Sequence, residues 1–143
     1  MRVALIILCL SSFLFSQDFF RIGSTNIVKN PNNKLVWVDN KEIMTFKLSH
    51  KEAEPYCENL VYAGRKTWRL PTLKEFETIV DKTNKRTYTK RAFKYARPNG
   101  FWAIKAHIRT FWFYADYMNF ISGTAYYDNR NKKKFVRCVS SMN

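Results

Sequence analysis

The sequence predicts a small α+β domain in which two helices pack on an antiparallel sheet and one disulfide joins Cys57 to Cys138. Three observations lead to this fold class. Two helix starts of the Ser/Thr-x-x-Glu kind, at Ser49 and Thr72, occur in the middle of the chain. Short apolar runs bounded by turn residues flank them, as strands of an antiparallel sheet do. The N-terminus has the pattern of an export signal, so we expect the cysteines to reach an oxidising compartment.

The N-terminal segment has the pattern of a cleaved signal peptide, residues 1–16. Arg2 is followed by an uncharged run, Val3 to Leu10, and then by small serines that end at Ser16. A membrane anchor is the rival interpretation, but the run is shorter than the roughly 20 residues that span a bilayer. A lipoprotein processed at Cys9 fits less well, because the run before it is short and bulky. We expect cleavage after Ser16 and a location in the periplasm, in the medium or at the cell surface.

The remaining chain divides into an N-terminal extension, residues 17–33, and one domain, residues 34–143. The domain begins with an apolar run, Leu35–Val38, and a second run follows at Ile43–Phe46. The polar pair Asp39–Asn40 lies between them and has turn chemistry. The sequence therefore predicts that these two runs are the strands of a hairpin.

The first predicted helix begins at Ser49, whose hydroxyl is three residues before Glu52 in a capping box. We expect it to run toward Tyr62. Pro55 would lie in its second turn, so the helix should kink there or begin later. The apolar spacing places Cys57 on the face toward the core.

The second predicted helix begins at Thr72, pairs it with Glu75 in another capping box, and ends near Asp81. A basic and aromatic stretch without clear periodicity follows, Lys82–Asn99, which we interpret as a long loop. The rest of the chain predicts further strands at Phe101–Ile104, Thr110–Ala115, Gly123–Tyr127 and Phe135–Val139.

The cysteines form an even pair once the signal, with Cys9, is removed. A bridge from Cys57 to Cys138 encloses about 80 residues and stabilises the fold by roughly 4.5 kcal/mol in the chain-entropy model. Two buried free thiols are the alternative, which requires that export fails.

Charge is unevenly distributed along the chain. Residues 17–81 contain 10 Lys and Arg against 9 Asp and Glu, whereas residues 82–143 contain 14 against 2. Ordinary solvated surfaces mix both signs, so a half of one sign indicates an anionic partner. A generally basic proteome is the alternative explanation.

Several segments together resemble one protein family. They are Leu35-Val36-Trp37-Val38-Asp39, Glu52-Ala53, Tyr56-Cys57-Glu58-Asn59-Leu60, the motif Trp68-Arg69-Leu70-Pro71-Thr72 with Glu75-Phe76, and Phe135-Val136-Arg137-Cys138-Val139. This set is similar to the Lcl C-terminal domain family, the adhesin domain at the end of a bacterial collagen-like surface protein. The resemblance extends from about Asn26 to Ser140.

The resemblance implies a C-type-lectin-like fold, export, and a role in binding rather than catalysis. In the name-giving member the domain looks like a trimeric module that recognises sulfated polysaccharide. That member's collagen-like region is absent here, so the resemblance does not imply the same trimer, and a homo-oligomer is left open. The chain departs from the family at Phe101–Ile104 and in its unusually basic Lys82–Arg97 stretch. The identity of the ligand is therefore the property that the resemblance to the family implies least strongly for this chain.

No catalytic or metal-binding pattern occurs in the sequence. The histidines, His50 and His107, lack metal-ligand spacing, and we interpret His50 as a solvent-facing residue in a first helical turn. A Cys-His nucleophile would require an unpaired Cys57. A calcium site needs clustered oxygen ligands, but Asp116 and Asp128 are the only acids after Asp81. We therefore expect no metal, no cofactor and no enzymatic activity.

Two arginines, Arg69 and Arg137, are expected to be structural, with ligand contact as the alternative. Arg69 lies just before a helix start, where a carboxylate or carbonyl groups can pair with it. Arg137 lies between Val136 and Cys138 in a predicted strand.

Aromatic residues are dense in the predicted strand Thr110–Ala115. Alternation places Phe111 and Phe113 on one face and Trp112 and Tyr114 on the other. One face must contribute to the core. The other packs on a helix or is exposed as a stacking surface for sugar rings or bases.

These observations predict an exported binding module for an anionic polysaccharide or a lipopolysaccharide-like surface, with nucleic acid a minor option. A scaffold subunit of the envelope with no polyanion ligand is the alternative. The candidate ligand-binding residues are Lys85, Arg86, Lys90, Arg91, Lys94, Arg97, Arg130, Lys132, Lys133 and Lys134.

Overall fold

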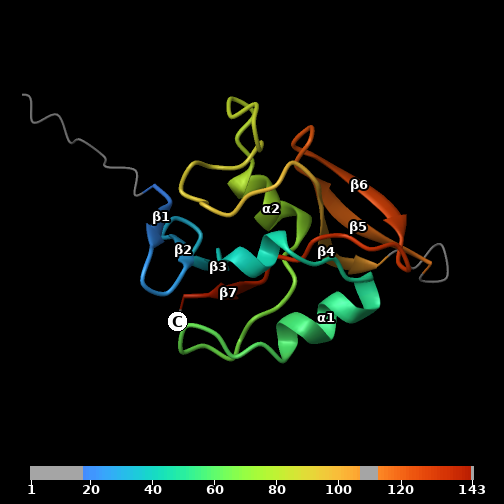
Figure 1. Ribbon diagram of the computed structural model, residues 1–143, viewed down its shortest axis with the longest axis horizontal. Coiled ribbons are helices and arrows are strands. Elements are labelled where there is room, and N and C mark those ends of the chain that lie inside the picture. Colours follow the sequence, from blue (N-terminus) through green and yellow to red (C-terminus); the bar gives the residue numbers. More distant parts are fainter. Residues whose placement is uncertain (1–17, 107–112, 143) are drawn as a thin grey trace, which may run out of the picture.

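Two antiparallel sheets and two α-helices make up the computed structural model, which describes residues 18–106 and 113–142 (Figure 1). The larger sheet has the spatial order β1 (Phe20–Ile22), β2 (Ile27–Asn30), β3 (Leu35–Val38) and β7 (Val139–Ser141). The smaller sheet has the order β4 (Gly100–Ala106), β5 (Tyr114–Asn119) and β6 (Thr124–Asn129). The predicted signal peptide lies outside the described residues.

Strand β3 lies in the interior of the larger sheet, and all four of its residues are buried. It pairs with β2 on one side and with β7 on the other. The predicted hairpin of Leu35–Val38 with Ile43–Phe46 is therefore wrong, because both edges of β3 are already occupied. Residues Lys41–Met44 form a 3-10 helix, η1, and the side chain of Asn40 caps it by accepting the N–H of Ile43.

The segment predicted as an N-terminal extension contributes β1 and β2, so the larger sheet begins before position 34. Asn30 turns the chain between β2 and β3, because its side-chain oxygen accepts the N–H of Asn32 at 3.1 Å. This turn fixes the register in which Asn30 faces Leu35.

Helix α1 (His50–Glu58) has the predicted capping box, in which Ser49 and Glu52 satisfy each other's backbone N–H. The helix continues through Pro55 without a later start, and it ends before the predicted Tyr62. It stops because the N–H of Leu60 returns to the carbonyl of Cys57 at 3.1 Å, which tightens the last turn.

Helix α2 (Leu73–Ile79) also has its predicted capping box. Thr72 Oγ1 accepts the N–H of Glu75 at 3.1 Å, and a Glu75 carboxylate oxygen accepts the N–H of Thr72 at 2.8 Å. The helix ends at Ile79 because Val80 takes an extended conformation and bridges to Thr89.

The two helices cover opposite faces of the smaller sheet. On β4, the ring of Trp102 lies against His50 of α1 with centroids 5.4 Å apart. The next residue back, Phe101, contacts Phe120 at 5.5 Å, and Phe120 contacts Phe76 of α2 at 5.8 Å. Neighbouring strand residues point to opposite faces, so α1 and α2 sandwich this sheet.

The strands after the loop differ from prediction in their limits. The predicted Phe101–Ile104 strand lies within β4. Of the predicted Thr110–Ala115 strand, only the end overlaps β5, and residues 107–112 lie outside the described part. The predicted Phe135–Val139 strand is also displaced, since β7 begins at Val139. Phe135 instead bridges to Phe101, because this segment crosses from the smaller sheet to the larger one.

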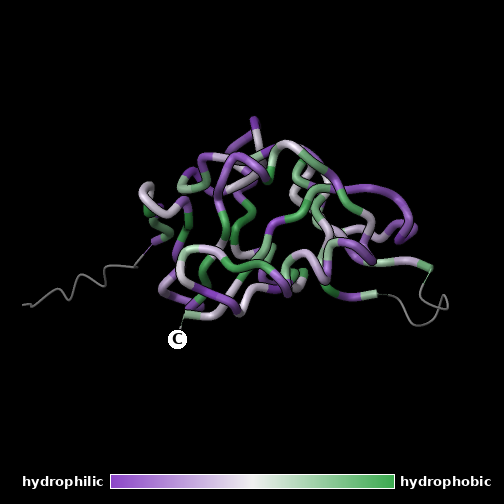
Figure 2. Tube along the Cα trace, turned by 60° about the horizontal axis from the view of Figure 1, so that its bottom comes forward, coloured by the Kyte–Doolittle hydropathy of each residue, from purple (hydrophilic) through white to green (hydrophobic). Residues whose placement is uncertain are grey.

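A disulfide between Cys57 and Cys138 joins α1 to the segment just before β7, as predicted. Both cysteines are buried in a core that includes Trp37, Trp68 and Trp102. In Figure 2 the apolar stretches run mainly through the interior of the trace, and hydrophilic residues occupy the projecting loops.

Candidate functional site

The basic loop, residues 82–99, leaves the end of α2 and is folded back on itself at its start. The backbone N–H of Asp81 donates to the carbonyl of Tyr88 at 2.9 Å. Inside this turn, the Asn84 side-chain amide donates to Thr87 Oγ1 at 2.9 Å and to the carbonyl of Thr89 at 2.8 Å. These bonds satisfy polar groups within the loop, so its tip is structured.

Asp39 anchors the other half of the basic loop to the larger sheet. Its fully buried carboxylate accepts the backbone N–H of Lys94 at 3.0 Å and that of Tyr95 at 3.1 Å. The same carboxylate is 2.7 Å from Arg21 Nε and 3.3 Å from an Arg137 guanidinium nitrogen. One aspartate thus holds two backbone amides and two guanidinium groups.

Arg137 is structural, in agreement with the sequence-based expectation. Its guanidinium donates to the carbonyls of Val38 and Tyr95 and lies 4.8 Å from the ring centroid of Phe93. Burial lowers the pKa of Arg137, and the charge of Asp39 opposes that effect. The buried pair of Asp39 and Arg137 is the link between the loop and the core.

The cations of the loop project from this anchored backbone. Lys85, Arg86, Arg91, Lys94 and Arg97 are exposed, and Lys90 is half-buried. Within residues 18–106 and 113–142, none of these six is within 4 Å of a carboxylate oxygen. Instead, Lys85 lies over the Tyr88 ring, Lys94 over Tyr95 and Arg97 over Phe135.

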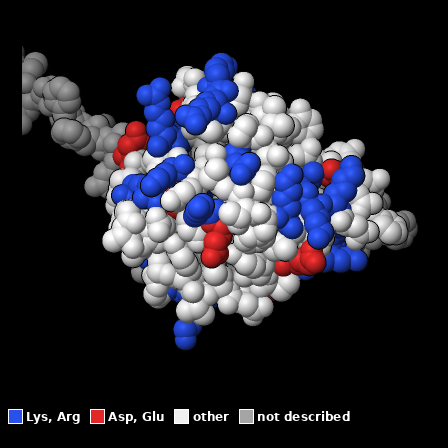
Figure 3. Space-filling model, in the orientation of Figure 1, with Lys and Arg blue, Asp and Glu red and all other residues white. Residues whose placement is uncertain are grey.

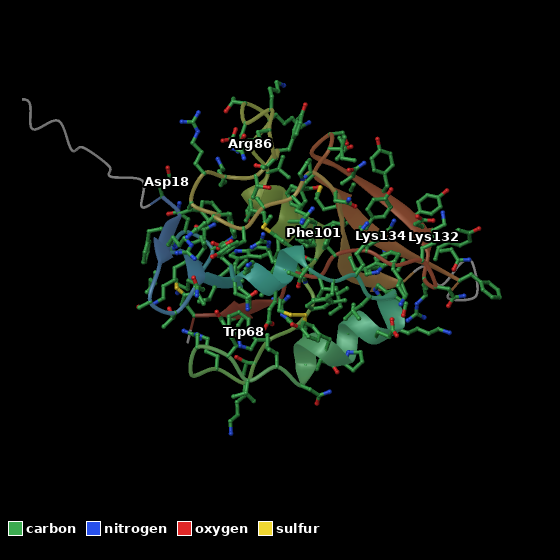
Figure 4. The ribbon with its side chains drawn as sticks, viewed as in Figure 1. Asp18, Trp68, Arg86, Phe101, Lys132 and Lys134 are labelled. Carbon is green, nitrogen blue, oxygen red and sulfur yellow. A yellow bond between two sulfur atoms is a disulfide. The ribbon has the colours of Figure 1, made fainter. Side chains whose placement is uncertain are left out.

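A hollow of about 350 Å³ opens between the loop and η1, and we call it the loop groove. Three of the predicted ligand-binding residues line it: Arg86, Arg91 and Lys94. Met44 of η1 and Phe93 contribute apolar surface. Arg86 marks the tip of the loop in Figure 4, well away from the Lys132–Lys134 end of the molecule.

The second predicted basic segment, the turn from Arg130 to Lys134, behaves differently. Lys134 has a side chain only 12% exposed, its ammonium donates to Asp128 at 2.9 Å, and it lies 3.9 Å from the centroid of the Tyr117 ring. Arg130 is 3.8 Å from Glu54, and Lys132 is 3.0 Å from Asp128. Burial tends to raise the pKa of Asp128, but hydrogen bonds from Lys134 and Lys132 lower it to about 2.

The structure thus divides the predicted basic residues into two groups. The loop cations carry no carboxylate partner in the described chain, whereas three of the four turn cations are held in ion pairs. Figure 3 shows Lys and Arg gathered on one face over the loop, with a separate group toward the β5–β6 end. Lys133 is the exposed member of the turn that no carboxylate contacts within 4 Å in the described residues.

The Trp68–Thr72 motif is part of the framework. Trp68, Leu70 and Pro71 are buried, and Trp68 Nε1 donates to the carbonyl of Tyr62 at 3.2 Å. Arg69 forms a two-pronged ion pair with Glu75, at 2.6 and 2.8 Å. This hydrogen-bonded pairing raises the pKa of Arg69. The motif therefore orients the start of α2 and, through it, the start of the basic loop.

Sequence reasoning did not single out the exposed aromatic residues of β6. Tyr126 and Tyr127 are 49% and 62% exposed, and β6 is an edge strand. Phe113 is also 61% exposed, whereas Trp112 lies outside the described residues. Two adjacent tyrosines on a strand point to opposite faces of the sheet. The sequence alone therefore indicates that at least one of the two rings lies outside the core.

The structure contradicts the expectation for His50. His50 is fully buried rather than solvent-facing, because its Nε2 bonds to the carbonyl of Ala103 at 2.8 Å between α1 and β4. His107 lies outside the described residues.

In the part of the chain that is described, His, Cys, Asp and Glu side chains nowhere gather in threes as a metal site would require. Within the same residues, no helix has the length and apolar character to cross a membrane.

Comparison with known proteins gives one match. The family model described as the Lcl C-terminal domain matches residues 26–140, which is most of the chain. No curated protein and no solved structure matches the chain. The C-type-lectin-like classification of the fold therefore stays a prediction.

Proposed function

The chain belongs to the Lcl C-terminal domain family, and we propose that it is an exported, non-enzymatic binding module for an anionic polysaccharide or another anionic envelope or host surface. The observation that carries the proposal is the set of exposed loop cations that lack carboxylate partners in the described residues. Clustered like charges repel each other, and a polyanion relieves that repulsion when it binds.

The chemistry of these side chains fits sulfate, phosphate and carboxylate groups. Arginine offers a planar fork of N–H donors to such groups, and lysine offers a point charge. The loop backbone is held by Asp39, so the cations are presented on an ordered segment. A preorganised array loses less conformational entropy on binding than a flexible tail does.

The disulfide supports an exported location, since such bonds persist in oxidising compartments. In that setting the candidate ligands are sulfated glycans, the phosphates of lipopolysaccharide and other anionic surfaces. Nucleic acid is the minor option, although a basic and aromatic surface suits it physically.

Retention on immobilised dextran sulfate, with uncharged dextran as the control matrix, tests the proposal. We expect the oxidised protein to bind the sulfated matrix at physiological salt and to elute as NaCl increases, because salt screens exposed charges. Passage through both matrices without delay would reject polyanion binding.

A second candidate function is a protein-binding subunit of the envelope, and the exposed tyrosines of β6 favour it. Exposed aromatic residues are enriched at protein interfaces. A photoreactive residue placed at Tyr127 in the exporting cell would report a partner in contact with this strand. Efficient cross-linking to one protein, combined with indifference to dextran sulfate, would favour this function over polyanion binding.

A further inference from the structure

The loop groove differs from the hollow beside it in the charge of its lining. Arg86, Arg91 and Lys94 line it, and no carboxylate does. A neighbouring hollow of about 460 Å³ shares Arg91 but also includes Asp18 and Asp81. An anion entering that neighbour meets two like charges, so the loop groove is the better seat for an anion.

The nearest buried carboxylate does not neutralise the loop groove. Asp39 lies under Lys94 and holds its backbone N–H, but its oxygens already face the guanidinium groups of Arg21 and Arg137. The cluster of Asp39, Arg21 and Arg137 contains two cations and one anion, so it has a net positive charge. The field inside the groove is therefore positive from the lining and from below.

The donors of the groove match a tetrahedral oxyanion. The guanidinium groups of Arg86 and Arg91 make no hydrogen bond or ion pair with the described chain, so their N–H groups are available. Thr87 Oγ1 accepts from Asn84 at 2.9 Å, which leaves its own O–H free to donate. Donors from separate residues can each bond a different outer oxygen of a sulfate or phosphate monoester.

The apolar part of the groove indicates what the oxyanion is attached to. Phe93 is 5% exposed and is held by Trp37 and by Arg137, so it forms a fixed floor with little surface open to a ligand. Met44 contributes a second apolar contact. Carbon-bearing surface beside cations is suited to a small organic ring that carries a charged ester. A volume of about 350 Å³ is near the lower end for ligand pockets, which extend from about 300 to 1,000 Å³.

We propose that the loop groove binds one sugar unit bearing a sulfate or phosphate monoester, with Arg86 and Arg91 donating to the ester oxygens, Lys94 adding charge and Met44 contacting the carbon part of the sugar. The inference rests on the proposed polyanion-binding function and makes it specific, because it separates one selective site from the diffuse attraction of the remaining cations.

Titration of the isotope-labelled protein with glucose 6-sulfate, glucose 6-phosphate and glucose, followed by amide chemical shifts, tests this assignment. Both esters should shift the amides of residues 84–96, and glucose should not. A preference of about tenfold for the sulfate identifies a sulfated glycan as the source, and the reverse preference identifies a phosphorylated sugar. Either preference supports the groove.

The variant pair Arg86→Gln/Arg91→Gln should weaken ester binding by about tenfold or more, since charge-assisted hydrogen bonds are lost. The matched control is Lys51→Gln/Lys66→Gln, which removes two exposed charges outside both the groove lining and the basic loop. The control should change ester affinity less than about threefold.

Equal weakening by the two pairs would overturn the groove assignment, because bulk charge would then explain the binding. Unmoved groove amides in a protein that still binds dextran sulfate would overturn the groove and leave the proposed function standing. Failure to bind either the esters or dextran sulfate would overturn both. Thermal unfolding of each variant checks that the loop substitutions leave the fold intact.

Discussion

The Asp39 carboxylate and the Arg137 guanidinium form a buried ion pair, with 3.3 Å between Oδ1 and the nearest nitrogen. Neither side chain is more than 2% exposed. They are 98 residues apart, and they meet because β3 lies beside the segment that leads into β7. Through Lys94 and Tyr95, the same aspartate fixes the backbone of the basic loop. The position of the cationic surface therefore depends on this pair.

The variant Asp39→Asn should lower the free energy of unfolding by about 3–5 kcal/mol, because it leaves Arg137 buried without its counter-charge. Urea denaturation of the oxidised protein measures the change. Glu77→Gln is the matched control, since Glu77 is exposed on α2 and its loss removes the same charge. A change below about 1 kcal/mol for Asp39→Asn would show that the pair does not hold the loop.

Removal of the disulfide with Cys57→Ala/Cys138→Ala should cost about 4–5 kcal/mol, because the bridge joins residues 81 positions apart and restricts the unfolded chain. Denaturant unfolding of this variant against the oxidised wild type gives the value. Intact mass before and after reduction is the direct check on the exported protein. A mass that does not increase by two hydrogens on reduction would mean that the bridge is absent.

Acidification below pH 6.5 should destabilise the protein through His50. Burial lowers the pKa of His50 from 6.5, although the Ala103 carbonyl and Glu54 favour its charged form, and Arg130 opposes it. Because the folded-state pKa is depressed, the contribution of His50 to the free energy of unfolding is fully present above pH 6.5. It is lost as the pH falls toward the pKa of the folded state. The slope from this residue is at most about 1.4 kcal/mol per pH unit.

Thermal unfolding between pH 7.5 and 5 measures that loss. His50→Gln is the informative comparison, because its amide can still donate to the Ala103 carbonyl but does not titrate in this range. The unfolding temperature of this variant should change less between pH 7.5 and 5 than that of the wild type. Parallel pH profiles for the two proteins would assign the effect to other groups.

Lys134 should be important for stability and Lys133 should not, although they are sequence neighbours. Lys134→Gln removes a hydrogen bond to Asp128 and a cation–π contact with Tyr117, so we expect a loss of about 1–2 kcal/mol. Lys133→Gln should be within about 0.5 kcal/mol of the wild type. Equal and negligible losses in thermal unfolding would contradict the structural role of Lys134.

Local patterns predicted the helices and the disulfide, whereas contacts between distant residues decided the rest. The capping boxes at Ser49 and Thr72 involve residues three positions apart, so the sequence contains the whole signal. The role of Asp39 depends on Arg137, and no local pattern shows this contact. In the sequence, Asp39 and Asn40 have only the turn chemistry of their residue types, and this led to the wrong prediction of a hairpin after Leu35–Val38.

Distant contacts also separate the basic residues into two groups. The run Lys132-Lys133-Lys134 looks uniform in sequence, but only the fold reveals that Lys134 is covered by Tyr117 and bonded to Asp128. The loop cations were identifiable from the absence of acids between Asp81 and Asp116. Their gathering around Phe93 and Met44 needed the position of η1, which the sequence predicted as a strand.

The salt concentration that elutes two charge-matched variants from dextran sulfate tests the central claim most directly. One variant removes three groove cations, Arg86→Gln/Arg91→Gln/Lys94→Gln. The other removes three exposed lysines elsewhere, Lys51→Gln/Lys66→Gln/Lys74→Gln, so that both have the same net charge. We predict that the groove variant elutes at much lower salt than the wild type, while the control elutes close to it. Elution of the two variants together would contradict a role for the basic loop as the binding site.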